Sequence, residues 1–256
     1  MNASIGKFVW YELATSDRAG AEAFYRSVVG WEFKDAGMPG QAYTLFSAGP
    51  VMVGGMYAPS GECGEELKPG WMGYVEVPDV DGYVERVRQA GGTLQHPPTD
   101  IPEVGRFAIV ADPYGAAFVL IQGLGDMGPV TAPGATPGRI GWHELHAGDG
   151  EGAFTFYAKL FGWTLADAMD MGPMGAYRIF AIDGTPAGGM MTRTPDTPRS
   201  FWLFYLNVDA LDAAMERCRR GGGKVLLGPE QVPGGSWVVH ALDPQGAMFA
   251  MVAPSR

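Results

Sequence analysis

Alternating apolar and polar positions predict a strand near the start of the chain and a short helix directly after it. Residues 8–13 carry aromatic and β-branched side chains at the two-residue period of a strand. Asp17 then offers an N-cap, apolar residues recur at helical spacing through residues 19–29, and Gly30 offers a C-cap. Three further apolar runs, at 31–33, 42–46 and 51–56, complete a predicted β-α-β-β-β order.

The same order recurs three more times along the chain. A second module is predicted from a strand at 72–77, a helix from Asp79 to Gln89, and strands at 93–94, 107–110 and 117–121. The second half repeats both modules, with helices from Asp149 to Leu160 and from Asp209 to Arg219. Because one helix covers only one face of such a sheet, two modules must pair, and their concave faces would enclose a cup for a ligand. We therefore predict an α+β fold of four βαβββ modules, paired into two domains with cup-shaped mixed sheets.

Short motifs show that the second half is a copy of the first. Trp10-Tyr11-Glu12-Leu13 returns as Trp142-His143-Glu144-Leu145, Gly54-Gly55-Met56 returns as Gly188-Gly189-Met190, and Asp112-Pro113-Tyr114-Gly115-Ala116 returns as Asp243-Pro244-Gln245-Gly246-Ala247. A repeat of this length duplicates a domain and is too long for a solenoid unit. Between the copies lies a Gly- and Pro-rich stretch without an apolar period. We predict a first domain at 1–125, a linker at 126–138 and a second domain at 139–256.

Composition restricts the partners. The net charge of −10 disfavours nucleic acid and anionic membrane surfaces, and no apolar run approaches the roughly 18 residues of a membrane span. The two cysteines, Cys63 and Cys218, occupy unrelated places in the two copies, which favours a reducing, cytoplasmic compartment. The expected partner is a small molecule, and the sequence leaves open whether the chain acts as a monomer or a homodimer.

The motifs also occur in a known family. A Trp-x-Glu-Leu strand, a Phe-Tyr pair in the first helix, Phe161-Gly162-Trp163 at a helix end, and Asp-Pro-x-Gly-Ala before a last strand together resemble the vicinal oxygen chelate superfamily. That superfamily contains glyoxalase I, extradiol dioxygenases and bleomycin-resistance proteins. The resemblance covers nearly the whole chain twice and points to its tandem-domain members. It implies that enzymes of the family chelate a divalent metal inside the cup through His, Glu or Gln.

The resemblance places the metal-ligand positions at residues without suitable donors. In the first domain they correspond to Trp10, Met72, Val119 and the region of Met56; in the second they correspond to Trp142, Leu203, Ala250 and the region of Met190. Divalent metals of this family need oxygen or nitrogen ligands. We therefore expect no metal at the usual positions and no resident cofactor, with a divalent metal elsewhere as the alternative.

Strand parity supplies the polar candidates. If Trp10 and Trp142 face the cups, so do Glu12, Glu144 and His146. By the same parity Tyr74 and Glu76 accompany Met72, while Tyr205 and Asn207 accompany Leu203. Glu12 and Glu144 are therefore candidate catalytic bases, with a structural role for both as the alternative. A relocated metal would be held by Glu144, His146 and His240.

The remaining candidates are aromatic and cationic. Five tryptophans are expected either to stack on a flat ligand in the cups or to pack in the cores: Trp10, Trp71, Trp142, Trp202 and Trp237. Arg106 is the candidate cation for an anionic ligand in the first domain, with a solvated turn as the alternative. Trp31 and Trp163 are expected to close the cores, and His96 is expected in an exposed loop. The leading hypothesis is a protein that binds a small apolar or aromatic molecule. The alternatives are a lyase or dioxygenase with a relocated metal, an isomerase with a Glu base, and an interaction scaffold without a ligand.

Overall fold

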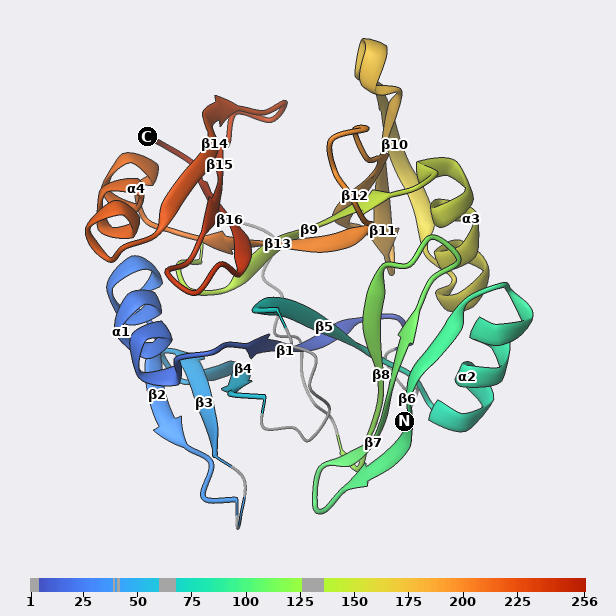
Figure 1. Ribbon diagram of the computed structural model, residues 1–256. Helices are drawn as coiled ribbons and strands as arrows, with labels where there is room; N and C mark the ends of the chain where they lie inside the picture. The colour runs from blue at the N-terminus through green and yellow to red at the C-terminus, as the bar shows by residue number, and fades with distance from the viewer. Residues whose placement is uncertain (1–4, 39, 41, 60–67, 126–135) are drawn as a thin grey trace. The chain divides into compact units, whose positions relative to one another are not determined.

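The computed structural model describes residues 5–38, 40, 42–59, 68–125 and 136–256. It confirms the four βαβββ modules (Figure 1). The first module comprises β1 (Phe8–Ala14), α1 (Arg18–Val29), β2 (Glu32–Asp35), β3 (Tyr43–Ala48) and β4 (Val51–Tyr57). The second comprises β5 (Gly70–Glu76), α2 (Val80–Gln89), β6 (Thr93–Ile101), β7 (Gly105–Ala111) and β8 (Ala117–Gly123).

The second half of the chain repeats this order. The third module comprises β9 (Ile140–Ala147), α3 (Gly150–Phe161), β10 (Thr164–Asp170), the short helix η1 (Gly172–Met174), β11 (Ala176–Ile182) and β12 (Thr185–Thr192). The fourth comprises β13 (Phe201–Asn207), α4 (Leu211–Arg220), β14 (Lys224–Gln231), β15 (Trp237–Leu242) and β16 (Met248–Ala253).

Each half of the chain forms one eight-stranded mixed sheet. The strand orders are β2-β3-β4-β1-β5-β8-β7-β6 and β10-β11-β12-β9-β13-β16-β15-β14. In every module the first strand pairs in parallel with the last, and the outer strands pair antiparallel. The predicted α+β class is confirmed.

The helix boundaries follow the capping residues. The side chains of Asp17, Asp79 and Asp149 each accept a backbone N–H in the first turn, which satisfies one of the donors that a helix start leaves unpaired. Gly30 and Gly162 end α1 and α3 in the left-handed conformation, at φ of 78° and 77°. The fourth helix begins two residues later than expected, after Ala210 and without a side-chain cap.

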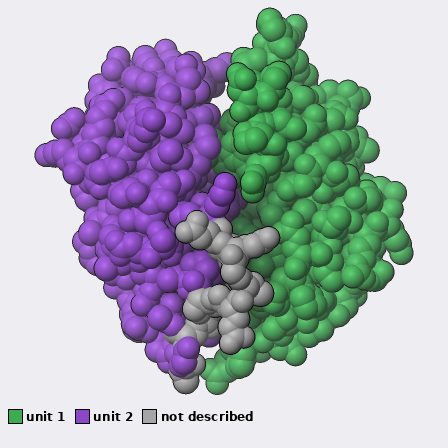
Figure 2. Space-filling view, in the orientation of Figure 1, with its two compact units in different colours: residues 1–9, 72–129, 142–203 green, residues 10–71, 130–141, 204–256 purple. Residues whose placement is uncertain are grey.

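Two compact units divide the described residues, and each unit takes one module from each half of the chain (Figure 2). The first unit contains the second and third modules, with α2 against α3, and includes residues 72–129 and 142–203. The second contains the first and fourth modules, with α1 against α4, and includes residues 10–71 and 204–256. Residues of the linker at 126–135 and Cys63 lie outside the described part of the chain.

A buried aromatic cluster fills the second unit. Tyr25 stacks on Trp31 at 5.4 Å between ring centroids, Trp31 stacks on Phe46 at 4.3 Å, and Trp71 meets all three edge-on. The Trp31 ring donates its N–H to the carbonyl of Gly138 at 2.6 Å. The corresponding cluster of the first unit contains Tyr157, Trp163, Phe180 and Trp202. The prediction that Trp31 and Trp163 close the cores is confirmed.

The repeated Phe-Tyr and Asp-Pro-x-Gly motifs join the two halves of the chain. In the second unit Tyr25 donates its hydroxyl hydrogen to Asp243 Oδ2 at 3.0 Å and accepts the Trp71 indole N–H at 3.2 Å. The other carboxylate oxygen of Asp243 accepts the backbone N–H groups of Gln245 and Ala247. Buried carboxylates need such partners to offset desolvation.

The first unit contains the equivalent bonds. Tyr157 donates to Asp112 Oδ2 at 3.2 Å and accepts the Trp202 N–H at 3.1 Å. Burial raises the pKa of Asp112 and Asp243, while the hydrogen bonds that each accepts oppose that rise. In each unit, a tyrosine on a helix of one half therefore donates a hydrogen bond to the buried aspartate in a turn of the other half.

The expectation of an exposed loop at His96 is wrong. His96 lies in β6, which is longer than predicted and continues through Pro97 and Pro98, and its ring stacks on Phe107 at 5.3 Å. Proline is tolerated there because β6 is the outer strand of its sheet, and the register shifts on both sides of His96.

Candidate functional site

The same three side chains are linked by hydrogen bonds on the first strand of each half. On β1 the Trp10 indole N–H lies 3.2 Å from the Tyr43 hydroxyl, and that hydroxyl donates to Glu12 Oε1 at 2.8 Å. On β9 the Trp142 N–H donates to the Tyr177 hydroxyl at 2.8 Å, and Tyr177 donates to Glu144 Oε2 at 2.9 Å. We call each set the Trp-Tyr-Glu trio. Trp10 and Trp142 are only partly buried, so their rings keep accessible surface.

The two tyrosines were not among the residues singled out from the sequence, and the repeated Gly-Gly pairs explain their placement. A Cβ on Gly55 would lie 2.2 Å from the Tyr43 hydroxyl oxygen, and a Cβ on Gly189 would lie 2.0 Å from the Tyr177 ring. Both glycines are on the last strand of their module, which pairs in parallel with the strand that carries the Glu. Each glycine therefore provides the space in which the tyrosine lies across the sheet and reaches its carboxylate.

Burial and the neighbouring carboxylate keep these tyrosines protonated. Burial, followed by the charge of Glu12, raises the pKa of Tyr43; burial, followed by the charge of Glu144, raises the pKa of Tyr177 well above its ordinary value. Each hydroxyl therefore acts as a donor to its glutamate. Strand parity placed Trp and Glu of each half on one face, and the trios bring them together through a third residue.

The second half adds a histidine to its trio. His146 Nε2 lies 2.7 Å from Glu144 Oε1, and the imidazole stacks on Phe201 with ring centroids 4.7 Å apart and planes 3° apart. The side chains of His146 and Glu144 are 15% and 9% exposed. In the first half the aligned residue is Ala14.

Several other predicted site residues are buried. Val119 and Ala250 have no exposed surface, and Leu203 is 1% exposed. Tyr74 and Glu76 are 7% and 9% exposed, whereas Met72 is partly buried. Glu12 and Glu76 belong to different compact units, as do Glu144 and Asn207, so the prediction that each pair shares a cup stays a prediction.

The predicted residues of the fourth module form contacts within their own unit. The Tyr205 hydroxyl lies 2.8 Å from His240 Nε2. Asn207 is 3% exposed and lies against Gly141, where a Cβ would be 2.2 Å from the Asn207 side-chain oxygen. Trp237 is partly buried beneath the guanidinium of Arg256, which lies 5.3 Å from its ring centroid.

Arg106 already forms two ion pairs. Its guanidinium contacts Asp81 at 2.7 Å and Asp100 at 2.8 Å, and hydrogen bonds to these carboxylates raise its pKa. An anionic ligand at Arg106 would have to compete with both aspartates.

The donor set does not fit a divalent metal of the family type. The positions that the resemblance implies carry indole, thioether and aliphatic side chains. Within the described ranges, no three or more His, Cys, Asp or Glu residues are grouped in a way that could hold a metal ion. Of the proposed relocated set, His146 bonds to Glu144, whereas His240 bonds to Tyr205 in the other compact unit.

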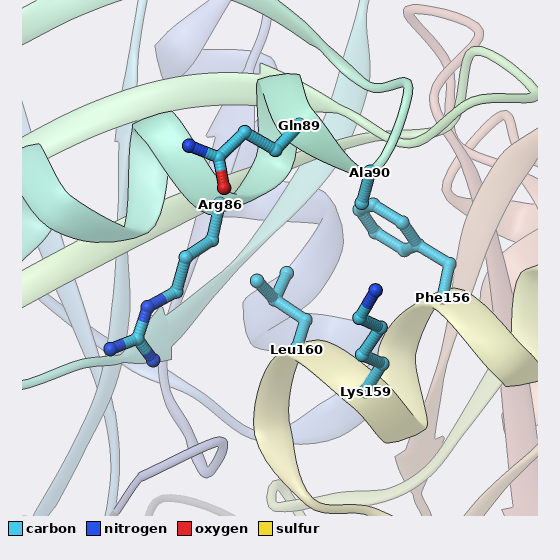
Figure 3. Close-up of a pocket in the computed structure, with 6 residues that line it drawn as sticks. All are labelled: Arg86, Gln89, Ala90, Phe156, Lys159 and Leu160. Atoms are coloured by element: carbon cyan, nitrogen blue, oxygen red, sulfur yellow. The ribbon is translucent and has the colours of Figure 1, made fainter.

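A shallow groove of about 290 Å³ lies on the helical side of the first unit (Figure 3). Arg86 and Gln89 of α2 and Ala90, which follows α2, line it together with Phe156, Lys159 and Leu160 of α3. None of these residues belongs to a trio. No helix in the described part of the chain has the length and apolar character needed to cross a membrane.

The paired βαβββ modules with two eight-stranded mixed sheets define the class of proteins built on glyoxalase-like domains. The model of the Glyoxalase/Bleomycin resistance protein/Dioxygenase superfamily matches residues 7–120 and 139–251. The chain belongs to this superfamily, which confirms the resemblance found in the sequence.

Relatives of similar length share both halves. CFP32 of Mycobacterium tuberculosis (strain CDC 1551 / Oshkosh), provisionally named a glyoxylase, is 30% identical over 248 residues, covering 96% of this chain and 94% of the relative. The anthracycline biosynthesis protein DnrV of Streptomyces peucetius is 32% identical over 262 residues, covering 96% and 93%.

Solved structures share the fold at low identity. The 2,3-dioxygenase LapB from Pseudomonas sp. KL28 superimposes with a TM-score of 0.67 at 14% identity, covering 99% of this chain and 94% of that one. The Mn(II)-bound glyoxalase from Novosphingobium aromaticivorans superimposes with a TM-score of 0.64 at 14% identity, covering 99% and 84%. These similarities concern the fold alone.

Proposed function

We propose that the protein binds a small apolar or aromatic molecule against the Trp-Tyr-Glu trios of its two halves, without a metal at the family's usual position. The trio itself carries this proposal. Its indole ring keeps accessible surface while its N–H is held by a tyrosine, so the ring is oriented in advance for stacking on a flat ligand. The boundaries 1–125 and 139–256 would then each contain one binding domain.

The glutamates support the proposal because each places a hydrogen-bonding carboxylate beside an aromatic ring. A partly buried carboxylate is unfavourable unless it is hydrogen-bonded, and a tyrosine hydroxyl satisfies one oxygen of each glutamate. Such a group orients a ligand through hydrogen bonds while the apolar surroundings supply affinity. The relatives named for anthracycline biosynthesis favour a fused-ring aromatic ligand.

A fluorescence and thermal-shift screen of fused-ring aromatic compounds tests the proposal. A compound that binds should quench tryptophan emission, and at a concentration of about 100 times its Kd it should stabilise the protein by about 2.7 kcal/mol. Trp10→Leu and Trp142→Leu should each weaken binding. Trp163→Phe changes a buried core ring outside the trios and should leave ligand binding intact. If no fused-ring compound shifts the melting temperature, or if the trio variants bind as the wild type does, the proposal is wrong.

A further inference from the structure

The surroundings of the two trios differ at two positions whose side chains contact each other in the second half. In the second half, His146 stacks on Phe201 at 4.7 Å. In the first half the aligned positions hold Ala14 and Gly70. A Cβ on Gly70 would have its nearest neighbour 3.9 Å away, so no close packing requires a glycine there. Both stacking partners are therefore present in one half, and neither is present in the other.

His146 is held in a defined orientation. Its Nε2 lies 2.7 Å from Glu144 Oε1, and the Phe201 ring lies parallel to it within 3°. An ionised carboxylate only accepts hydrogen bonds, so Nε2 carries the proton that it donates to Glu144. The other oxygen of Glu144 accepts the Tyr177 hydroxyl at 2.9 Å. The imidazole, the carboxylate and the phenol thus form one connected set beside the Trp142 ring.

We infer that the Glu144–His146 pair makes the second half more selective than the first for an aromatic molecule that bears a hydroxyl group. This inference rests on the proposed function. A hydroxyl on an aromatic ring is a strong hydrogen-bond donor, and the pair presents a carboxylate and an imidazole polarised by it. The His146 side chain is 15% exposed and that of Glu144 is 9% exposed, so a ligand would contact the imidazole first. The stack on Phe201 places this polar pair at the edge of an aromatic surface.

A pair of probes that differ by one hydroxyl separates this inference from the proposed function. Naphthalene and 2-naphthol share a ring system, and calorimetric titration of the intact protein measures the affinity and the number of sites for each. A hydrogen bond to a charged partner corresponds to about a tenfold to hundredfold gain in affinity. We expect 2-naphthol to exceed naphthalene by about tenfold or more at one site per chain.

His146→Ala gives the second half the residue found in the first. It should reduce the preference for 2-naphthol over naphthalene by about tenfold, with folding checked by the melting curve. Glu144→Gln should also reduce the preference. His96→Ala removes a histidine that stacks on Phe107 at 5.3 Å outside both trios, so it is the matched control and should preserve the preference. An unchanged preference in His146→Ala, or an equal loss in His96→Ala, would overturn the inference. Equal binding of both probes would overturn the inference while supporting the proposed function, and binding of neither would overturn both.

Discussion

His143 should make the stability of the protein depend on pH. The residue is 1% exposed, its ring stacks on Phe8 with centroids 4.0 Å apart, and its Nδ1 donates to the Ala187 carbonyl at 2.7 Å. Burial lowers the pKa of His143 from 6.5 to about 4, and the hydrogen bond to Ala187 only partly opposes this. Between these values the unfolded chain binds a proton that the folded chain does not.

The sign and the magnitude follow from this difference. As pH falls below 6.5, protonation favours the unfolded chain, so the free energy of unfolding decreases until pH about 4 is reached. At about 1.36 kcal/mol per unit of pKa the full loss is about 3 kcal/mol, and the loss between pH 7 and pH 5 is about 2 kcal/mol.

Urea unfolding of the wild type and of His143→Gln at pH 7 and pH 5 measures this contribution. Glutamine does not titrate, and its amide can still donate to the Ala187 carbonyl. The raised pKa values of Asp112 and Asp243 act in the opposite direction, since they increase stability as pH falls, but they are common to both proteins and cancel in the comparison. The wild type should lose about 2 kcal/mol more than the variant. The same pH dependence in both proteins, or an NMR titration that places the His143 pKa near 6.5, would refute the reasoning.

Three further outcomes are expected. Tyr25→Phe and Tyr157→Phe should each lower the free energy of unfolding, measured by urea titration, by about 2–4 kcal/mol. In each variant a buried aspartate loses a hydrogen-bond donor and a tryptophan N–H loses its acceptor. A decrease below about 1 kcal/mol would contradict this expectation. Gly189→Ala should destabilise the protein by about 1–3 kcal/mol and displace Tyr177 from Glu144. Gly70→Ala, whose added Cβ would have its nearest contact at 3.9 Å, should be tolerated. Unfolding curves and a structure of the Gly189→Ala variant test both expectations, and equal stability of the two variants would contradict the role of the Gly-Gly pair. Dialysis against EDTA should leave the melting temperature unchanged, because the donors at the family's positions are indole, thioether and aliphatic groups; a lower melting temperature that Mn²⁺ or Fe²⁺ restores would disprove this.

The sequence predicted the secondary elements well because periodicity and capping residues act locally. Asp17, Asp79 and Asp149 start helices as expected, and Gly30 and Gly162 end them. The errors lie where a neighbouring strand decides the outcome. His96 is part of a strand because β7 pairs with it, and nothing near Pro97 and Pro98 in the sequence shows that partner.

The candidate site was predicted in part for the same reason. Strand parity grouped Trp10 with Glu12 and Trp142 with Glu144 and His146, since parity is a property of one strand. Tyr43 and Tyr177 were missed because they come from another strand and reach the glutamate only across a glycine. The signal was present in Gly54-Gly55 and Gly188-Gly189, whose repetition marked a place where a side chain crosses the sheet.

The Tyr-Asp bonds between the halves, Tyr25 with Asp243 and Tyr157 with Asp112, bear on how the duplicated copies could diverge. If the same contacts joined two identical chains in a homodimer, every substitution would appear in both subunits. Within one polypeptide the two copies are encoded separately, so position 146 can hold histidine while the aligned position 14 holds alanine. A covalent tandem repeat therefore allows its two copies to carry different side chains at equivalent positions.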